Sequence, residues 1–259
     1  MDLYNVLNTI SQYPVVVSFP HSGTYLPDSI RNRMKKSAVM TNMDWFLPEL
    51  FDFLKEYGVT QIISNISRYV VDLNRAPNQF KSDNYVQSVV YESNTFGTRL
   101  YESSLSKTEI AERIETYYKP YHEELKRQLS EKILQFGKVY LIDIHSFFQQ
   151  YNEDICIGNS DGATSDRETV KVFEENLQLY DFSTNIDSIF KGGNTIKYYR
   201  SLYGDVFQGL IFEINYRAYI DNRYFGEEEV SAYNEKLFKS AKIRLEKALV
   251  ETFNIWSKL

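Results

Sequence analysis

Short apolar runs alternate with longer amphipathic stretches along this chain, and that alternation predicts an α/β fold. The short runs are rich in β-branched and aromatic residues and are almost continuously apolar. Runs of this kind are typical of strands that are buried on both faces of a sheet. The predicted core strands are Pro14–Phe19, Gln61–Ile66, Val139–Ile144, Asp154–Gly158 and Gly209–Ile214.

The longer stretches carry apolar residues at helical spacing and begin with capping residues. The predicted helices are Asp44–Tyr57, Ser106–Phe136, Ser165 to about Tyr180, and about Glu227 to Trp256. Gly58 ends the first of them. Ser106 opens a capping box, and Pro120 is expected to kink or break the same helix because proline lacks an amide donor.

The segment Arg75–Leu100 has no clear period and is rich in Asn, Ser and Tyr. It predicts a long loop with short strands, and loops of that length within a compact domain are often functional. No Gly-, Ser- or Pro-rich linker divides the chain, so we expect a single domain over residues 1–259.

Composition excludes several classes of function. The formal net charge is −6, and Lys and Arg are mixed with Glu along the helical stretches, whereas a nucleic-acid binder normally presents a basic stripe. The single Cys156 excludes a disulfide within the chain and a Cys-rich zinc site, and a buried, inert thiol is expected. Neither a signal-peptide pattern nor a long apolar run is present, so a cytoplasmic protein without a membrane span is expected.

Two of the three histidines lie at the carboxyl ends of predicted strands. His21 follows the first strand and His145 ends the third, and ligands in open α/β sheets bind beyond such ends. The two imidazoles can therefore converge on one metal ion, although a structural, hydrogen-bonded role for each is the alternative. Asp143 shares a strand face with His145 and is predicted to orient it through the second ring nitrogen. His122, inside a predicted helix, is interpreted as structural or as an edge residue of the site.

Glu213 stands alone in a strongly apolar strand. Burial of an unpaired carboxylate is costly, so this residue needs a partner, a metal or a catalytic task, and general base is the favoured hypothesis. The alternative is a strand end at which the side chain reaches solvent.

The polar segment Ser67–Arg75 follows the second predicted strand. It holds Arg68, Asn74 and Arg75, and guanidinium groups bind carboxylates through planar, bidentate hydrogen bonds. A carboxylate clamp is therefore one hypothesis, and a surface cluster of ion pairs is the other.

Taken together, these segments resemble the N-formylglutamate amidohydrolase family over about Val15 to Tyr219. Each matching piece is short, but their number and order make the resemblance specific. The main pieces are Pro20-His21-Ser22-Gly23, Ser67–Arg75, Asp143-Ile144-His145-Ser146, Gly192-Gly193 and Glu213-Ile214-Asn215.

The resemblance implies a mixed central sheet flanked by helices, similar to zinc carboxypeptidases (a phosphorylase/hydrolase-like fold). It also implies a site for Zn²⁺ or another divalent metal, held by His21, His145 and an acidic third ligand. Asp44 is the predicted third ligand, with Glu49 as the alternative.

The implied activity is metal-dependent hydrolysis of an N-formyl, or other N-acyl, acidic amino acid such as N-formyl-L-glutamate. Metal-activated water would attack the carbonyl, and formate and the amino acid would be released. The implied roles are general base for Glu213, oxyanion contact for Arg68, and substrate contacts for Asn74, Arg75, Gly192 and Gly193. The alternatives are a zinc peptidase or deacylase acting on another N-acyl amino acid, and a metal-free binding protein for small molecules.

Overall fold

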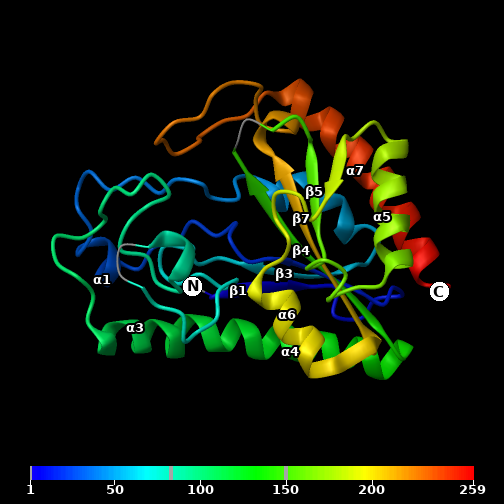
Figure 1. The fold of residues 1–259 in the computed structure, drawn as a ribbon, viewed down its shortest axis with the longest axis horizontal. Coiled ribbons are helices and arrows are strands. Elements are labelled where there is room, and N and C mark those ends of the chain that lie inside the picture. Colours follow the sequence, from blue (N-terminus) through cyan, green and yellow to red (C-terminus); the bar gives the residue numbers. More distant parts are fainter. Residues whose placement is uncertain (1, 82–83, 149–150) are drawn as a thin grey trace.

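The computed structural model describes residues 2–81, 84–148 and 151–259. Within these residues, seven strands form one sheet in the order β1-β3-β2-β4-β7-β5-β6 (Figure 1). The strands are β1 Tyr4–Leu7, β2 Val15–Phe19, β3 Thr60–Ser64, β4 Val139–Phe147, β5 Ile155–Gly158, β6 Thr184–Ile186 and β7 Phe207–Asn215.

The sheet is mixed, as predicted. Its central strands β3, β2, β4 and β7 are parallel, whereas β1 runs antiparallel to β3 and β5 runs antiparallel to β7. The carboxyl ends of β2, β4 and β7 therefore meet at one edge of the sheet. All five predicted strands are present, with ends that shift by a few residues. The short strands β1 and β6, whose side chains are largely half-buried, were not predicted.

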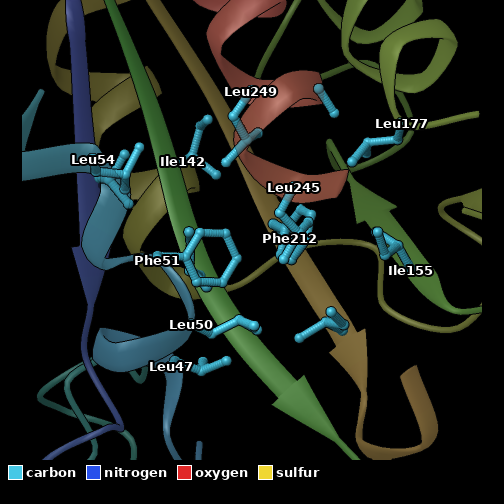
Figure 2. Close-up of a cluster of buried hydrophobic side chains, with 14 of the residues drawn as sticks. Leu47, Leu50, Phe51, Leu54, Ile142, Ile155, Leu177, Phe212, Leu245 and Leu249 are labelled. Atoms are coloured by element: carbon cyan, nitrogen blue, oxygen red, sulfur yellow. The ribbon is translucent and has the colours of Figure 1, made fainter. Parts of the chain in front are cut away.

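Helices cover both faces of the sheet (Figure 1). Helices α5 (Arg167–Leu179) and α7 (Glu235–Trp256) lie on one face, and α4 (Lys119–Phe136) and α6 (Asn194–Tyr203) lie on the other. Alternate residues of each strand divide between two cores, so Val15 and Val17 pack on the α7 side while Val16 packs on the α4 side. Figure 2 shows the first core, where leucines of α7 meet Ile142 and Phe212 of the sheet. Cys156 is buried in β5.

The prediction of one helix over Asp44–Tyr57 was wrong. The segment forms the short α2 (Leu47–Leu50) and a separate 3₁₀ helix (Asp52–Lys55). Phe46 has a left-handed backbone with φ of 59°, so no regular helix passes through it. Asp44 consequently lies in a loop rather than at the head of a helix.

The long helix predicted over Ser106–Phe136 is divided into α3 (Lys107–Arg113), a π-helical turn (Ile114–Tyr118) and α4. The Ser106 side chain caps α3 by accepting a hydrogen bond from the Glu109 amide at 3.1 Å. Pro120 is the second residue of α4, so the chain stays helical through the proline, and the irregular turn lies just before it.

The remaining helices differ from prediction mainly in their limits. The Asp166 side chain accepts from the Thr169 amide at 2.7 Å and so caps α5. Helix α7 begins at Glu235 and not near Glu227. Neither α6 nor the short α1 (Asp28–Arg31) was predicted.

The described part of Arg75–Leu100 is a loop, as expected, but the expected short strands are not found there. It holds a 3₁₀ helix at Tyr85–Gln87 and an isolated bridge between Ser93 and Arg99. Among the described helices, none is both long enough and apolar enough to cross a bilayer.

Candidate active site

The loop after β2 packs closely against the loop after β3 at Gly23, which has no side chain to keep them apart. A Cβ atom on Gly23 would lie 2.3 Å from the carbonyl carbon of Asn65, so no larger residue fits here without moving the backbone. Gly23 also forms an isolated bridge with Ser67. This close approach places His21, two residues past β2, beside the segment that begins at Ser67.

His145 and Glu213 are neighbours across two parallel strands. Strand β4 continues beyond the predicted end at Ile144 to Phe147, so His145 lies within the strand. It pairs in register with Glu213 of β7. The two side chains therefore emerge side by side at the carboxyl edge of the sheet.

His21, Asp44 and His145 form a compact, buried cluster. One ligand atom from each lies within 4.8 Å of the others, and the residues are only 2%, 1% and 3% exposed. Asp44 Oδ2 lies 3.1 Å from His145 Nδ1 and 3.7 Å from His21 Nδ1. Within the described residues, Glu49 is not part of this group.

The cluster has the properties of a metal site. Although it is buried, His21 Nδ1 has no hydrogen-bond partner among the described residues. An unpartnered buried nitrogen is costly unless its lone pair binds a ligand. Two imidazoles and one carboxylate are also a common donor set for catalytic zinc. The arrangement therefore fits a divalent cation that keeps an open position.

Each histidine is supported from behind by a carboxylate. His21 Nε2 lies 2.7 Å from Asp72 Oδ1, and His145 Nε2 lies 3.2 Å from Asp143 Oδ2. These contacts hold both rings with Nδ1 toward the cluster, as carboxylates commonly do for metal-binding histidines. Asp143 therefore lies where the sequence placed it, behind His145, and its other oxygen accepts from the Ser18 hydroxyl.

The protonation of the cluster follows from its surroundings. Burial, together with the nearby Arg68, lowers the pKa of His21 and keeps it neutral. Burial also disfavours charge on His145, but Asp143 and Asp44 outweigh it and hold the pKa of His145 well above its usual value. The Asp44 carboxyl has a lowered pKa because its contacts with His145 overcome its burial. Metal binding requires His145 to lose its proton, so affinity should rise with pH.

Sequence reasoning considered Asp72 only as part of the polar segment Ser67–Arg75 and missed its contact with His21. Besides its contact with His21, it accepts hydrogen bonds from the Asn74 amide at 2.7 Å, from Arg68 Nη2 at 3.2 Å and from the Tyr91 hydroxyl. Burial opposes its charge, but His21, Arg75 and Arg68 outweigh burial and hold the pKa of the Asp72 carboxyl well below its usual range. The available signal was a lone acid inside the apolar run before Asn74.

Ser146 was also missed. Its backbone amide and hydroxyl both donate to Asp44 Oδ1, at 3.2 and 3.3 Å. The serine that follows His145 therefore fixes the loop carboxylate against the strand. No periodic pattern signals such a contact, since it joins segments about one hundred residues apart.

Arg68 is held rigidly in the wall of the site. Its Nη1 donates to the Asn42 carbonyl at 3.0 Å, and its guanidinium lies 5.5 Å from the centre of the Tyr85 ring. Burial opposes its charge, but Tyr85 and Asp72 outweigh this and raise its pKa. Arg68 is thus a fixed positive charge beside the cluster.

Asn74 joins the site to α6. Its Oδ1 accepts from the Thr195 amide at 3.1 Å, and its Nδ2 lies 3.0 Å from His145 Nε2. A Cβ on Gly193 would lie 2.1 Å from Asn74 Oδ1, so the loop before α6 needs glycine at this position. The side-chain amide of Asn74 is therefore already engaged, which favours a positioning role over direct substrate contact.

His122 supports the neighbouring loop from α4. Its Nε2 donates to the Leu73 carbonyl at 2.8 Å, and its ring packs against Tyr118 with centroids 4.3 Å apart. The Tyr118 hydroxyl donates to the Arg75 carbonyl at 2.9 Å. Burial lowers the pKa of His122 to about 4. The residue is neutral and fits the structural interpretation.

These residues surround one cavity of about 700 Å³. The predicted site residues that line it are His21, Asp44, Arg68, Asn74, Arg75, His145, Gly192, Gly193 and Glu213. Burial raises the pKa of Glu213 to about 8, with Asp44 adding to the effect and His145 opposing it. The structure thus brings all of them together at the carboxyl edge of the sheet, with Asp143 behind the wall.

Comparison with known proteins gives one consistent family. Residues 13–220 match the family profile described as N-formylglutamate amidohydrolase. The chain is 27% identical to an N-formylglutamate deformylase of Pseudomonas putida, over 94% of this chain and 93% of the relative. It is 28% identical to one of Pseudomonas aeruginosa, over 72% of this chain and 74% of that relative.

A solved structure agrees. The crystal structure of an N-formylglutamate amidohydrolase from Ralstonia eutropha JMP134 covers 100% of this chain and 98% of its own, with a TM-score of 0.81 at 21% identity. At that identity the likeness establishes the fold.

Proposed function

Because this chain belongs to the N-formylglutamate amidohydrolase family, we propose that it hydrolyses the amide bond of an N-formyl acidic amino acid such as N-formyl-L-glutamate. Formate and the free amino acid are the products. The observation that carries the proposal is the buried group His21, Asp44 and His145, with its unpartnered nitrogen, which lines the same cavity as the neighbouring Glu213.

His21, Asp44 and His145 hold the divalent metal, with Zn²⁺ the favoured ion for this donor set. When bound, such a cation polarises the substrate carbonyl and lowers the pKa of water, which generates the nucleophile near neutral pH. Asp72 and Asp143 keep the two imidazoles oriented for this task.

Glu213 is the general base. It removes a proton from the attacking water and later passes that proton to the leaving amine nitrogen. A raised pKa of about 8 suits this exchange, because the carboxyl both accepts and returns a proton near neutral pH. Positive charge held by the neighbouring cluster would favour its ionised form before the reaction.

The arginines bind the charged parts of the reaction. Arg68, fixed by Asp72 and the Asn42 carbonyl, stabilises the negative charge that develops on the carbonyl oxygen. Arg75 binds a substrate carboxylate. Gly192 and Gly193 line the cavity just before α6 and would contact the substrate there through their backbone.

The test combines metal analysis with a hydrolysis screen. We expect about one divalent ion per chain, and release of formate from N-formyl-L-glutamate that stops on chelation and returns with Zn²⁺. N-acetyl-L-glutamate and N-formyl-L-leucine test the acyl group and the side chain. A metal-loaded protein that hydrolyses only N-acetyl substrates would favour the deacylase alternative. A folded protein that binds no metal would favour the binding-protein alternative.

A further inference from the structure

Lys197 lies in the wall of the same cavity as the metal-binding cluster. It belongs to α6, and its side chain is exposed. Among the described residues no acidic side chain forms an ion pair with it. Within the described part of the chain its ammonium group therefore has no ion-pair partner, yet it lines the cavity in which the proposed substrate would lie.

Two other cations of this wall, Arg68 and Lys191, are already paired with carboxylates. Arg68 lies 3.2 Å from Asp72, and Lys191 lies 3.0 Å from Asp161. Arg75 is less constrained, since its Nε is 3.9 Å from Asp72 and its Nη1 donates to a carbonyl at 3.3 Å.

The balance of charged groups that line the cavity also points to Lys197. The carboxylates that face the cavity are Asp44 and Glu213, and a divalent cation at the cluster balances both. Arg75 and Lys197 then remain as cations with free hydrogen-bonding capacity. Their charge matches a ligand that carries two carboxylates.

We propose that Lys197 binds the side-chain carboxylate of the substrate, while Arg75 binds the α-carboxylate; this rests on the proposed function. The α-carboxylate is one carbon away from the amide nitrogen, so it must bind close to the cluster. Arg75 follows Asn74, whose amide nitrogen lies 3.0 Å from His145. Lys197 lies two residues along α6 from Thr195, whose amide donates to Asn74 Oδ1, and serves the more distant group.

The chemistry of the two cations suits these positions. The planar guanidinium of Arg75 fixes a carboxylate whose place relative to the scissile bond must be defined. The ammonium of Lys197 is a point charge on a flexible chain, which tolerates variation in the position of a side-chain carboxylate. Lys197 is therefore the residue that selects acidic over neutral side chains.

The experiment compares N-formyl-L-glutamate with N-formyl-L-glutamine, which has nearly the same shape without the side-chain charge. In Lys197→Met, kcat/KM for the glutamate substrate should fall roughly 10- to 100-fold, the usual worth of one charged hydrogen bond, while that for the glutamine substrate stays near its parent value. Lys197→Glu should reverse the preference. Because Lys197 is exposed, both variants should keep the parent thermal unfolding curve.

Lys191→Met is the matched control. It removes the same charge from the same wall, but from a lysine that is paired with Asp161. It should keep most of the parent preference for the acidic substrate. If both lysine variants lost the preference for the acidic substrate equally, the preference would come from the total positive charge of the wall. That result would overturn the proposal that Lys197 binds the side-chain carboxylate directly.

The two proposals fail in different ways. If the parent protein hydrolyses N-formyl-L-glutamate and Lys197→Met keeps the parent ratio of kcat/KM between the two substrates, the proposed role of Lys197 is wrong. The proposed function then still stands. If the parent protein, loaded with metal, hydrolyses neither substrate, the proposed function is overturned, and the proposed role of Lys197 is overturned with it.

Discussion

The two walls of the cavity are built differently. The ligand wall, made of His21, Asp44 and His145, is almost completely buried, and every side chain in it is held by a second polar group. The cation wall, made of Arg75 and Lys197, is more exposed and has few contacts within the fold. The difference favours a ligand wall that is preorganised for the proposed metal and a cation wall that would adjust when the proposed substrate binds.

The largest effect should come from breaking the ligand wall. Replacement of both histidines, His21→Ala with His145→Ala, removes two of the three proposed metal ligands. We expect no bound metal after dialysis and activity at the level of the chelated parent, measured by elemental analysis and formate release. Full metal occupancy in the folded double variant would contradict the assigned site.

Glu213→Gln tests the group that lies between the walls. The substitution keeps the shape and removes the basicity, so turnover should fall roughly 10²- to 10⁴-fold while metal content and substrate affinity are retained. Single-turnover kinetics with metal analysis separates these effects. Loss of metal would instead make Glu213 a ligand, and near-normal turnover would move the base elsewhere, with Asp143 the next candidate.

Asp72→Asn tests whether the carboxylates that orient the two histidines contribute to metal affinity. The variant weakens the contact that orients His21, so metal affinity should fall roughly 10- to 100-fold, as for other residues that orient metal ligands. Competition with a fluorescent chelator measures this. Asp143→Asn should act similarly through His145, and an unchanged affinity in both variants would mean that the buried cluster needs no such support.

Arg75→Lys tests the residue of the cation wall that is proposed to bind the α-carboxylate. Lysine keeps the charge but cannot form the planar fork, so kcat/KM should fall by roughly tenfold. The comparison uses a substrate with a free α-carboxylate and the matching α-amide. A variant that matches the parent on both substrates would rule out the clamp.

His122 gives a smaller effect, on stability rather than catalysis. Its pKa is lowered from 6.5 to about 4 by burial, so the unfolded chain takes up a proton at a higher pH than the folded protein does. Stability is therefore full above about pH 6.5 and is lost as pH falls toward 4, by at most about 3 kcal/mol. Urea unfolding of the parent and of His122→Gln should show a weaker acid dependence in the variant. Parallel pH profiles would contradict this.

The sequence predicted what short-range patterns encode. Short apolar runs placed His21 after one strand and His145 at the end of another. Strand β4 in fact continues to Phe147, but the parallel centre of the sheet still brings the two histidines to the same edge. The family resemblance and the hydrolase class that it implied are likewise confirmed by the family match. The roles of the individual site residues stay predictions.

What the sequence did not predict depends on long-range contacts. Asp44 was placed in a helix because the residues after it have helical spacing, but the left-handed Phe46 prevents that helix, and contacts to His145 and Ser146 fix Asp44 instead. Asp72 gains its importance from a histidine 51 positions earlier in the chain. Helix α6 lacks a side-chain cap, so its start at Asn194, and with it the placement of Lys197, carried no local signal.

The π-helical turn before Pro120 has a consequence for the tolerance of this chain to insertions and deletions. A π turn holds one residue more than an α turn, and each residue rotates the following side chains by about 100° around the helix axis. Tyr118 and His122 reach the Arg75 and Leu73 carbonyls in the present phase. Loss of a single residue within the turn would give a regular α-helix of better local geometry. It would also rotate the residues on one side of the deletion about the helix axis, so that α3 and α4 could no longer both keep their present contacts. The irregular helix thus sets the rotational phase at which α4 meets the cavity.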